Sequence, residues 1–477
     1  MPQFKEDKVC QGLTFADCEL AILRQAVDKA EEIQGRKAAN SGEVKRIIGI
    51  VENFIRNKKL ICYGGTAINA ILPKQDQFYN KDVEIPDYDF YSASALDDAK
   101  ELVDIYLKHD FQEVEAKSGQ HHGTFKVFVN FIPVADITSI PKELFKAIKG
   151  ESIKVGGILY APPNLLRMGM YLELSRPAGD VSRWEKVLKR LSLLNKHYPL
   201  KGKECQFIEF QRPMSNTRDA NMIYENIQHT LIDQGVVFFG GYALSKFSHY
   251  MPKHLQHKLE KIPDFDVISE DPKLTAQIVK ERLMDIDVKK IKIIERPSVG
   301  EIIAPHYEIR VGNDTVAFIY QPIACHSYNI TKEEGYEIKI ATIDTMLSFW
   351  LAFLYADRPY YDKDRILCMA NYLFQVQEKN RLAQRGILKR FSLNCMGHQE
   401  TIEELRAEKA EKYAELKDKR GKPEFDEWFL RYRPQDAIKR DRDNVKNDIK
   451  NKNTVSKKTK SKKTKSKTKK KGWFYKS

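Results

Sequence analysis

The hydrophobic pattern of the chain predicts short helices that alternate with strands, in an order that occurs twice. In the first copy, Ile47, Val51 and Ile55 lie four residues apart, which predicts a helix with one buried face, and Ser41 is a suitable N-cap for it. A strand over residues 60–63 follows directly. It leads into a pair of glycines and a new helical pattern.

The rest of the first copy continues this alternation. Apolar residues at every second position over 124–131 predict a half-buried strand, and Pro133 is expected to end it before the next strand at 134–138. Helical patterns cover residues 66–72, 95–108, 163–175 and 184–195. We therefore expect an α+β unit in which helices flank a mixed sheet.

The second copy repeats this order at a nearly constant offset. Ile223, Ile227 and Leu231 align without gaps with the first helix when the glycine pairs of the two copies are superposed. A glycine pair at 240–241 and two acids at 264 and 266 then follow, as they do in the first copy. A repeated helix face, strand, glycine turn and acidic strand predicts a duplicated fold.

Outside the two copies the chain is helical and strongly charged. Residues 15–35 are typical of a surface helix, and the residues from 448 onward are mostly Lys, Ser, Thr and Asn, which cannot form a core. We expect an N-terminal helical segment over 1–40, two units over 41–200 and 201–385, a charged helical segment over 386–447 and a disordered tail over 448–477.

The net charge of +14 is concentrated in that tail. The last 28 residues contain 13 lysines and no acid, so the body of the chain is nearly neutral. Such a run binds phosphates without regard to sequence, and the aromatic residues at 473–475 could stack on bases. A solubilising or localisation tail is the alternative. The candidate RNA contacts are Lys457, Lys458, Lys460, Lys462 and Lys463.

The seven cysteines are scattered, and none forms a CxxC pair. This spacing is typical of reduced thiols rather than of a disulfide framework or a zinc site. The N-terminus lacks an apolar signal core, and the longest apolar run, near 349–356, is too short to cross a bilayer. We expect an intracellular protein of a reducing compartment, with no membrane contact.

The glycine pair of the first copy is a candidate phosphate site. Gly64 and Gly65 lie between a strand and a helix, where backbone N–H groups and the helix N-terminus can face an anion, and Thr66 can add a hydroxyl donor. Such turns are common, so the pair alone is weak evidence for a function.

The acids that follow strengthen the case. Asp87 and Asp89 are two apart, so on a strand their side chains point to the same face, where they repel each other unless a divalent cation lies between them. A solvated acidic strand is the alternative, but the apolar neighbours Ile85 and Phe90 favour a half-buried one. Asp136, in an otherwise apolar strand, is the candidate third acid of a two-metal site.

Gly-Gly, then Asp-x-Asp, then a single Asp in an apolar strand resembles the DNA polymerase beta-like nucleotidyltransferase superfamily. The two copies and the chain length resemble one branch of it, the poly(A) polymerase catalytic subunits of poxviruses and giant amoeba-infecting viruses. The resemblance covers most of residues 41–385. The interval from Gly65 to Asp87 is longer than in most of the superfamily, and Thr66 stands where many members have serine.

The resemblance implies roles for these residues. Asp87 and Asp89 would hold two Mg²⁺ or Mn²⁺ ions. Asp136 would hold the catalytic ion and help to deprotonate the RNA 3′-hydroxyl. The substrate ATP would place its β and γ phosphates on Gly64, Gly65 and Thr66. Additional nucleotide-binding candidates near the starts of two later helices are Asn164, Arg167 and Lys186, with Arg183 and Lys189 beside them; solvated helix charges are the alternative.

The second copy is expected to be degenerate. Aligning the segments that begin at Pro133 and Pro322 places Cys325 opposite Asp136, and a neutral thiol cannot replace a metal-binding carboxylate. Tyr242 also replaces Thr66 and puts bulk where a phosphate would lie. We interpret this unit as a structural and RNA-contacting half without turnover.

The leading hypothesis is therefore a template-independent polymerase that adds AMP from ATP to mRNA 3′ ends. Alternatives are a terminal transferase of other base preference, uridylyl or CCA-type, and a non-catalytic RNA-binding processivity scaffold. The expected partners are an RNA 3′ end and ATP, with a homo-oligomer or a processivity subunit left open. For a viral protein, the resemblance implies the host cytoplasm and the virion.

Overall fold

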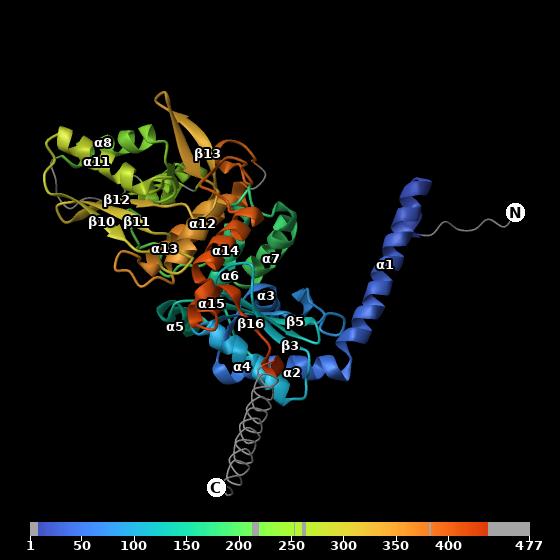
Figure 1. Cartoon of the computed structure of the whole chain (residues 1–477). Helices are drawn as coiled ribbons and strands as arrows, with labels where there is room; N and C mark the ends of the chain where they lie inside the picture. The colour runs from blue at the N-terminus through green and yellow to red at the C-terminus, as the bar shows by residue number, and fades with distance from the viewer. Residues whose placement is uncertain (1–7, 212–218, 252, 260–263, 381–382, 437–477) are drawn as a thin grey trace, which may run out of the picture.

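The computed structural model describes residues 8–211, 219–251, 253–259, 264–380 and 383–436. Within them the chain forms two mixed β-sheets, each flanked by helices (Figure 1). The first sheet has the order β16-β3-β4-β5-β2-β1-β7-β6. Its strands are β1 (Ile61–Cys62), β2 (Tyr88–Ser92), β3 (Val114–Ser118), β4 (Thr124–Val129), β5 (Ile132–Ser139), β6 (Ile153–Val155), β7 (Ile158–Tyr160) and β16 (Arg431–Tyr432).

The second sheet has the order β10-β11-β12-β9-β8-β14-β13-β15. Its strands are β8 (Val237–Phe238), β9 (Phe265–Ile268), β10 (Ile291–Arg296), β11 (His306–Val311), β12 (Asp314–Tyr320), β13 (His326–Glu333), β14 (Tyr336–Ala341) and β15 (Cys395–Met396).

The two sheets share one topology, which confirms the predicted duplication. The parallel pairs β2·β5 and β1·β7 of the first sheet recur as β9·β12 and β8·β14 in the second. The antiparallel pairs β1·β2 and β6·β7 likewise recur as β8·β9 and β13·β14. The α+β class with two tandem units is thus as expected from the sequence.

The helices correspond in part, because each unit has one helix before its first strand, one at the glycine pair, one after the acidic strand and two at its end. In the first unit they are α2 (Gly42–Lys58), α3 (Gly64–Ile71), α4 (Ala95–Lys108), α5 (Lys142–Glu151), α6 (Pro163–Leu174) and α7 (Trp184–His197). In the second they are α8 (Ala220–Asp233), α9 (Gly241–Ser245), α10 (Lys253–Gln256), α11 (Pro272–Asp285), α12 (Ile343–Phe353) and α13 (Lys363–Asn380). α6 and α12, which follow equivalent strands, pack against each other and join the two units.

The periodic positions used for the prediction are core positions. Ile47, Val51 and Ile55 of α2 are buried, as are Ile223, Ile227 and Leu231 of α8, and the side chain of Ser41 caps α2 as expected. Two local expectations were wrong. α3 begins at Gly64 rather than at Thr66, so the glycines form its first turn. Pro133 lies inside β5, where the β4·β5 register shifts and no ladder hydrogen bond from its nitrogen is needed.

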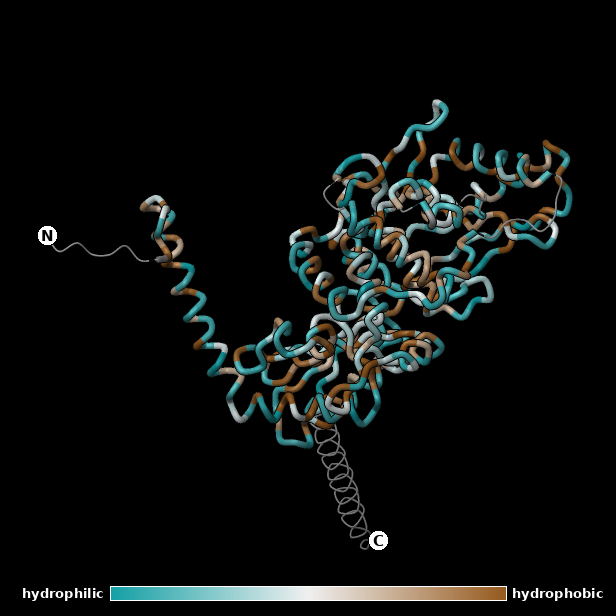
Figure 2. The backbone as a smooth tube through the Cα atoms, turned by 180° about the vertical axis from the view of Figure 1, so that it is seen from behind, coloured by the Kyte–Doolittle hydropathy of each residue, from teal (hydrophilic) through white to brown (hydrophobic). Residues whose placement is uncertain are grey.

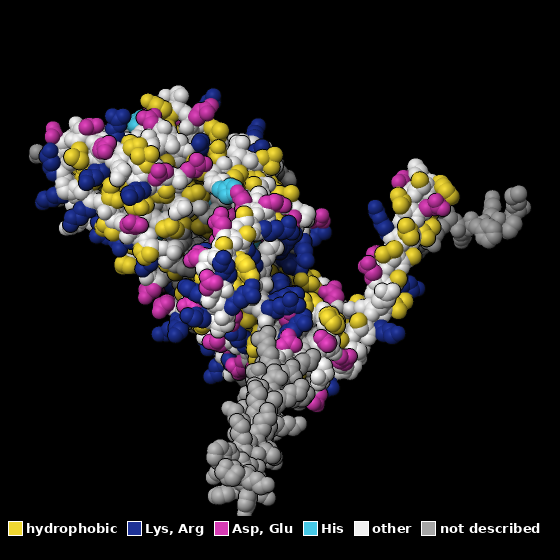
Figure 3. Space-filling view, viewed as in Figure 1, with side chains coloured by type: hydrophobic (Ala, Val, Ile, Leu, Met, Phe, Trp, Pro, Cys, Tyr) yellow, Lys and Arg dark blue, Asp and Glu magenta, His cyan; other side chains and the backbone are white. Residues whose placement is uncertain are grey.

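The terminal segments behave differently from each other. α1 (Phe15–Ala39) projects away from the body, and Ala39 is the residue it buries (Figures 1 and 2). Apolar side chains remain exposed along it (Figure 3). By contrast, α14 (Ile402–Leu416) and α15 (Pro423–Phe429) lie against the first unit, and β16 pairs with the edge strand β3. The expected disordered tail lies outside the described residues.

The expectation of reduced cysteines was wrong for six of the seven. The structure pairs Cys10 with Cys18, Cys205 with Cys368 and Cys325 with Cys395, and Cys62 is free and buried. Two of these pairs join residues 163 and 70 positions apart, which folding alone brings together. The spacing of the cysteines therefore gives no evidence for a reducing compartment. Among the described residues, no helix has the length and apolar character needed to span a membrane.

A buried ion pair anchors the segment after α13 to the helix at the unit interface. Arg390 donates to Asp344 of α12 at 2.7 Å, and the Asp344 side chain is 2% exposed. Replacing Arg390 by alanine leaves a buried carboxylate without its cation, so we expect Arg390→Ala to lower the free energy of unfolding by about 3–5 kcal/mol. Urea unfolding followed by circular dichroism measures this loss.

The matched control is Arg36→Ala. Arg36 forms a similar bond to Glu32 at 2.7 Å, but both side chains are more than half exposed, so the change should stay within about 0.5 kcal/mol. Equal effects of the two substitutions would show that burial of the Arg390 pair does not matter.

Candidate functional site

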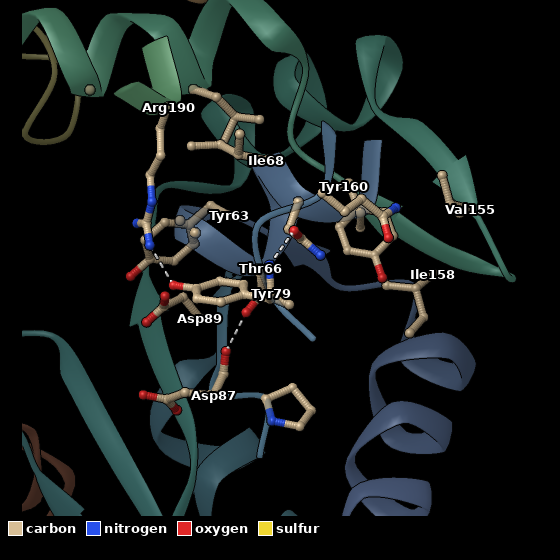
Figure 4. A pocket seen from close by; sticks show the side chains of 18 of the residues that line it. Tyr63, Thr66, Ile68, Tyr79, Asp87, Asp89, Val155, Ile158, Tyr160 and Arg190 are labelled. Atoms are coloured by element: carbon tan, nitrogen blue, oxygen red, sulfur yellow. Dashed lines mark hydrogen bonds between the residues drawn. The ribbon is translucent and has the colours of Figure 1, made fainter. Parts of the chain in front are cut away.

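A cavity of about 980 Å³ lies in the first unit, between the sheet, α3, α6 and α7. Figure 4 shows Asp87 and Asp89 on one side of it, below Arg190, and Tyr160 and Ile158 on the opposite side. The glycine pair and Thr66 also line the cavity. The structure therefore brings the predicted phosphate cradle and two of the predicted acids to one space.

The start of α3 is shaped by a close contact with an acid. Gly64 has φ +71°, and a Cβ at this position would lie 2.5 Å from Oδ2 of Asp89. Glycine is thus required for both the backbone conformation and the space. The N-cap Tyr63 makes no side-chain capping bond, and its own N–H donates to the Asp89 carbonyl at 2.9 Å. The residues of this first turn, Gly64, Gly65 and Thr66, line the cavity.

The three acids are brought together by strand register. In the parallel pair β2·β5, Asp89 lies beside Asp136, and Asp87 immediately precedes β2. Burial, then the charges of Asp87 and Asp136, raise the pKa of Asp89 to about 7. Burial and Asp136 likewise raise the pKa of Asp87. Negative charge is therefore concentrated at this end of the cavity.

The donor chemistry of this cluster fits a hard divalent cation. Carboxylate oxygens are the ligands that Mg²⁺ and Mn²⁺ prefer, and a cation would relieve the repulsion among the acids. Within the described part of the chain, no set of three acid, histidine or cysteine side chains already has a metal-holding arrangement. Asp136 is instead paired with Lys126 of the adjacent strand β4, its neighbour in the sheet register.

Thr66 makes a contact within the chain. Its hydroxyl donates to the main-chain carbonyl of Asp87 at 2.7 Å, a bond visible in Figure 4. It thereby ties the first turn of α3 to the residue just before β2. The side chain lines the cavity, so it fixes the position of Asp87 relative to the glycines.

The basic residues of α7, and Arg183 just before it, differ in whether they face the cavity. Arg183, Lys186 and Arg190 line the cavity, whereas Lys189 pairs with Glu185 and does not. Arg183 also bonds to Glu173 of α6 at 3.1 Å. Arg190 was missed in the sequence, although its spacing from Arg183 and Lys186 places all three on one side of a helix and could have indicated it.

Asn164 and Arg167 are not brought into the cavity. The Arg167 side chain is buried, donates to Asn195 at 2.7 Å, and bonds to Asn164 and to the Tyr198 carbonyl. Burial lowers the pKa of Arg167. The polar groups of these two residues hold α6 against α7 and the residues after it, and their predicted contact with a nucleotide stays a prediction.

The second unit lacks the third acid. The residue in its place is not the one that the sequence alignment indicated. In the parallel pair β9·β12, the residue beside Asp266 is Phe318, so Phe318 occupies the place of Asp136. Cys325 lies just before β13 and is bonded to Cys395. The similarity of the two Pro-containing segments misled the alignment. Tyr242 is buried and accepts from Gln228 at 2.9 Å.

His122 lies in the turn between β3 and β4, and its ring contacts that of Trp428 at 4.3 Å between centroids. The lysines 457, 458, 460, 462 and 463 lie outside the described residues, so their RNA contacts stay a prediction.

A family model described as poly(A) polymerase catalytic subunit matches residues 49–180, the segment that contains the glycine pair and all three acids. The "Putative poly(A) polymerase catalytic subunit" of Acanthamoeba polyphaga mimivirus is 24% identical over 422 residues, 79% of this chain and 70% of that protein. A protein of the same description from African swine fever virus (isolate Pig/Kenya/KEN-50/1950) is 33% identical over 180 residues, 36% of this chain and 38% of that protein.

Among solved structures, the fold matches that of the Megavirus polyadenylate synthase. The TM-score is 0.74 at 21% sequence identity, over 94% of this chain and 92% of that one. The likeness therefore extends beyond the matched family segment to the fold of both units.

Proposed function

We propose that this chain, which is similar to the poly(A) polymerase catalytic subunits of large DNA viruses, is a template-independent polyadenylate polymerase. It transfers AMP from ATP to the 3′-hydroxyl of an mRNA. The bond from the 3′ oxygen to the α phosphorus forms, the bond to the β phosphate breaks, and pyrophosphate leaves. The observation that carries the proposal is the register of Asp89 beside Asp136, next to Gly64.

The residues of the cavity have distinct roles in this reaction. Asp87, Asp89 and Asp136 would hold two divalent cations, Mg²⁺ or Mn²⁺, which would activate the 3′-hydroxyl and neutralise the charge on the leaving phosphates. Gly64 and Gly65 present backbone N–H groups to the phosphates. Thr66 positions Asp87, and Lys186 offers a cation to the triphosphate.

The comparisons do not favour the alternatives of another base preference or a non-catalytic scaffold. The test is to incubate an oligo(A) primer with each NTP separately, with Mg²⁺ or Mn²⁺, using the wild type and Asp87→Ala. We expect extension with ATP alone and its loss in the variant, because Asp87 belongs to the acid cluster of the cavity. Extension with UTP or CTP would contradict the base assignment, and no extension with any NTP would contradict the enzyme.

The division of labour between the two units can be tested with the same substitution of one aspartate in each unit. Asp136→Asn and Asp266→Asn make the same change on equivalent sheets, but the residue beside Asp266 is Phe318. We expect the first to lower the rate of AMP addition by at least roughly 10³-fold, and the second to leave it within about twofold. Single-nucleotide incorporation measures both.

Thermal unfolding provides the control for this pair, since both variants must be folded under the assay conditions. A loss of activity in folded Asp266→Asn as large as that in Asp136→Asn would show that the second unit also carries turnover.

The lysine-rich tail is proposed to hold the RNA product. A run of lysines neutralises phosphates in a salt-dependent manner, so deleting residues 450–477 should shorten the product at about 0.15 M salt while leaving addition of the first nucleotide unchanged. Product length on gels measures this. A control deletion of residues 472–477 removes the aromatic end and leaves most lysines. Unchanged product length without the lysines would refute the role.

The relatives are described as catalytic subunits, so a second copy of the chain or a separate processivity subunit is the alternative to the tail. Their viral origin further supports a viral protein that acts in the host cytoplasm and is carried in the virion.

A further inference from the structure

Tyr79 and Arg190 meet directly above the glycine pair. A Cβ at Gly65 would lie 2.6 Å from the Tyr79 hydroxyl oxygen and 2.8 Å from Nη1 of Arg190. Nη2 of Arg190 donates to that hydroxyl at 2.6 Å, and Figure 4 shows this bond crossing the cavity. The two side chains therefore fill the space over the first turn of α3, where the proposed function places phosphates.

The tyrosine is held there by its own loop. Asn69 of α3 is buried, and its Oδ1 accepts from the backbone N–H groups of Phe78 and Tyr79 at 2.7 and 2.9 Å. Asp76 of the same loop pairs with Lys196 at 2.9 Å and with His197 at 2.5 Å. The loop between α3 and β2 is thus fixed to α3 at one point and to the end of α7 at another.

The arginine lacks the partner that it binds best. Its guanidinium lies over the rings of Phe78 and Tyr79, with Cζ 4.7 and 5.3 Å from the centroids. Among the ion pairs within the described residues, none joins Arg190 to a carboxylate, and its hydrogen-bond acceptor is a neutral phenol. An anionic phosphate offers oxygens that match the guanidinium fork and bind it about twice as strongly as a neutral acceptor.

We propose that, in the nucleotide-free protein, the Tyr79 hydroxyl occupies the position that a phosphate oxygen of the nucleotide takes when it binds. The triphosphate of ATP displaces this hydroxyl from above Gly65 and takes Arg190 as its own ligand. Arg190 is thereby a triphosphate-binding residue, and Tyr79 sets the affinity by competing with the substrate. This inference rests on the proposed function. It gives a role to the long interval between Gly65 and Asp87, which carries Tyr79.

Substitutions of Tyr79 and of Arg190, the two partners of this hydrogen bond, should then change the affinity for ATP in opposite directions. Tyr79→Phe keeps the ring and removes the competing hydroxyl, so ATP should bind about three- to tenfold more tightly. Arg190→Ala removes the phosphate ligand, so ATP should bind at least about tenfold more weakly. Inorganic tripolyphosphate, which has no base, should show the same two shifts.

The experiment is calorimetric titration of the full chain with ATP and with inorganic tripolyphosphate, in Mg²⁺ and without RNA. Matched controls are Tyr432→Phe, whose hydroxyl bonds to Asp104 at 2.8 Å, and Arg46→Ala, whose guanidinium lies 5.0 Å from the Phe111 ring centroid. Neither residue lines the cavity, so both controls should match the wild type within about twofold. Arg190→Lys, which keeps the charge and loses the fork, serves if Arg190→Ala does not fold.

Shifts of the same sign for Tyr79→Phe and the Arg190 variants would overturn the inference. So would unchanged binding by Tyr79→Phe together with a Tyr79→Ala variant that loses affinity for ATP alone, because that result makes the ring a base-stacking platform. Primer extension by the wild type distinguishes a failure of this inference from a failure of the proposed function. If the wild type extends RNA with ATP and the shifts fail, this inference alone is wrong; if it does not extend RNA, the proposed function is wrong.

Discussion

The site depends on the close approach of the main chain at Gly64 to the carboxylate of Asp89. This contact exists because the strand carrying the acid pairs directly with the strand that leads into α3, and the Tyr63 N–H donates to the Asp89 carbonyl at 2.9 Å. A side chain at Gly64 would push against the carboxylate, so helix start and acid are fixed as one unit. The pairing of β1 with β2 therefore places the candidate phosphate site beside the candidate metal ligands.

The second unit shows that this contact belongs to the fold and not to the chemistry alone. A Cβ at Gly240 would collide with the Asp266 carboxylate, and the Phe239 N–H donates to the Asp266 carbonyl at 3.0 Å. The geometry is thus repeated where the third acid is replaced by Phe318. The two units therefore differ at this strand position, which carries Asp136 in the first unit and Phe318 in the second.

The sequence predicted the parts of this arrangement that depend on local periodicity. The core faces of α2 and α8, the glycine pairs and the convergence of Asp87 and Asp89 follow from spacing along one segment. The placement of Arg167 and the pairing of Cys205 with Cys368 depend on contacts between distant segments, which no local pattern reports. The alignment of Cys325 with Asp136 failed for the same reason, because strand order decides which residues face each other.

In this structure a group of the chain itself contacts each end of the site. At the acidic end, the Lys126 ammonium pairs with Asp136 and lowers the pKa of Asp89 against the stronger effects of burial and its acidic neighbours. At the basic end, the Tyr79 hydroxyl occupies the Arg190 guanidinium. A divalent cation would replace Lys126 as the partner of Asp136, and a phosphate would replace the Tyr79 hydroxyl as the partner of Arg190. In both cases the new partner binds more strongly than the internal one. Both ends of the site lie at the first turn of α3. Without substrate, internal partners occupy the acidic and the basic groups, and the same groups are preorganised for a substrate that brings a metal cation and a phosphate together.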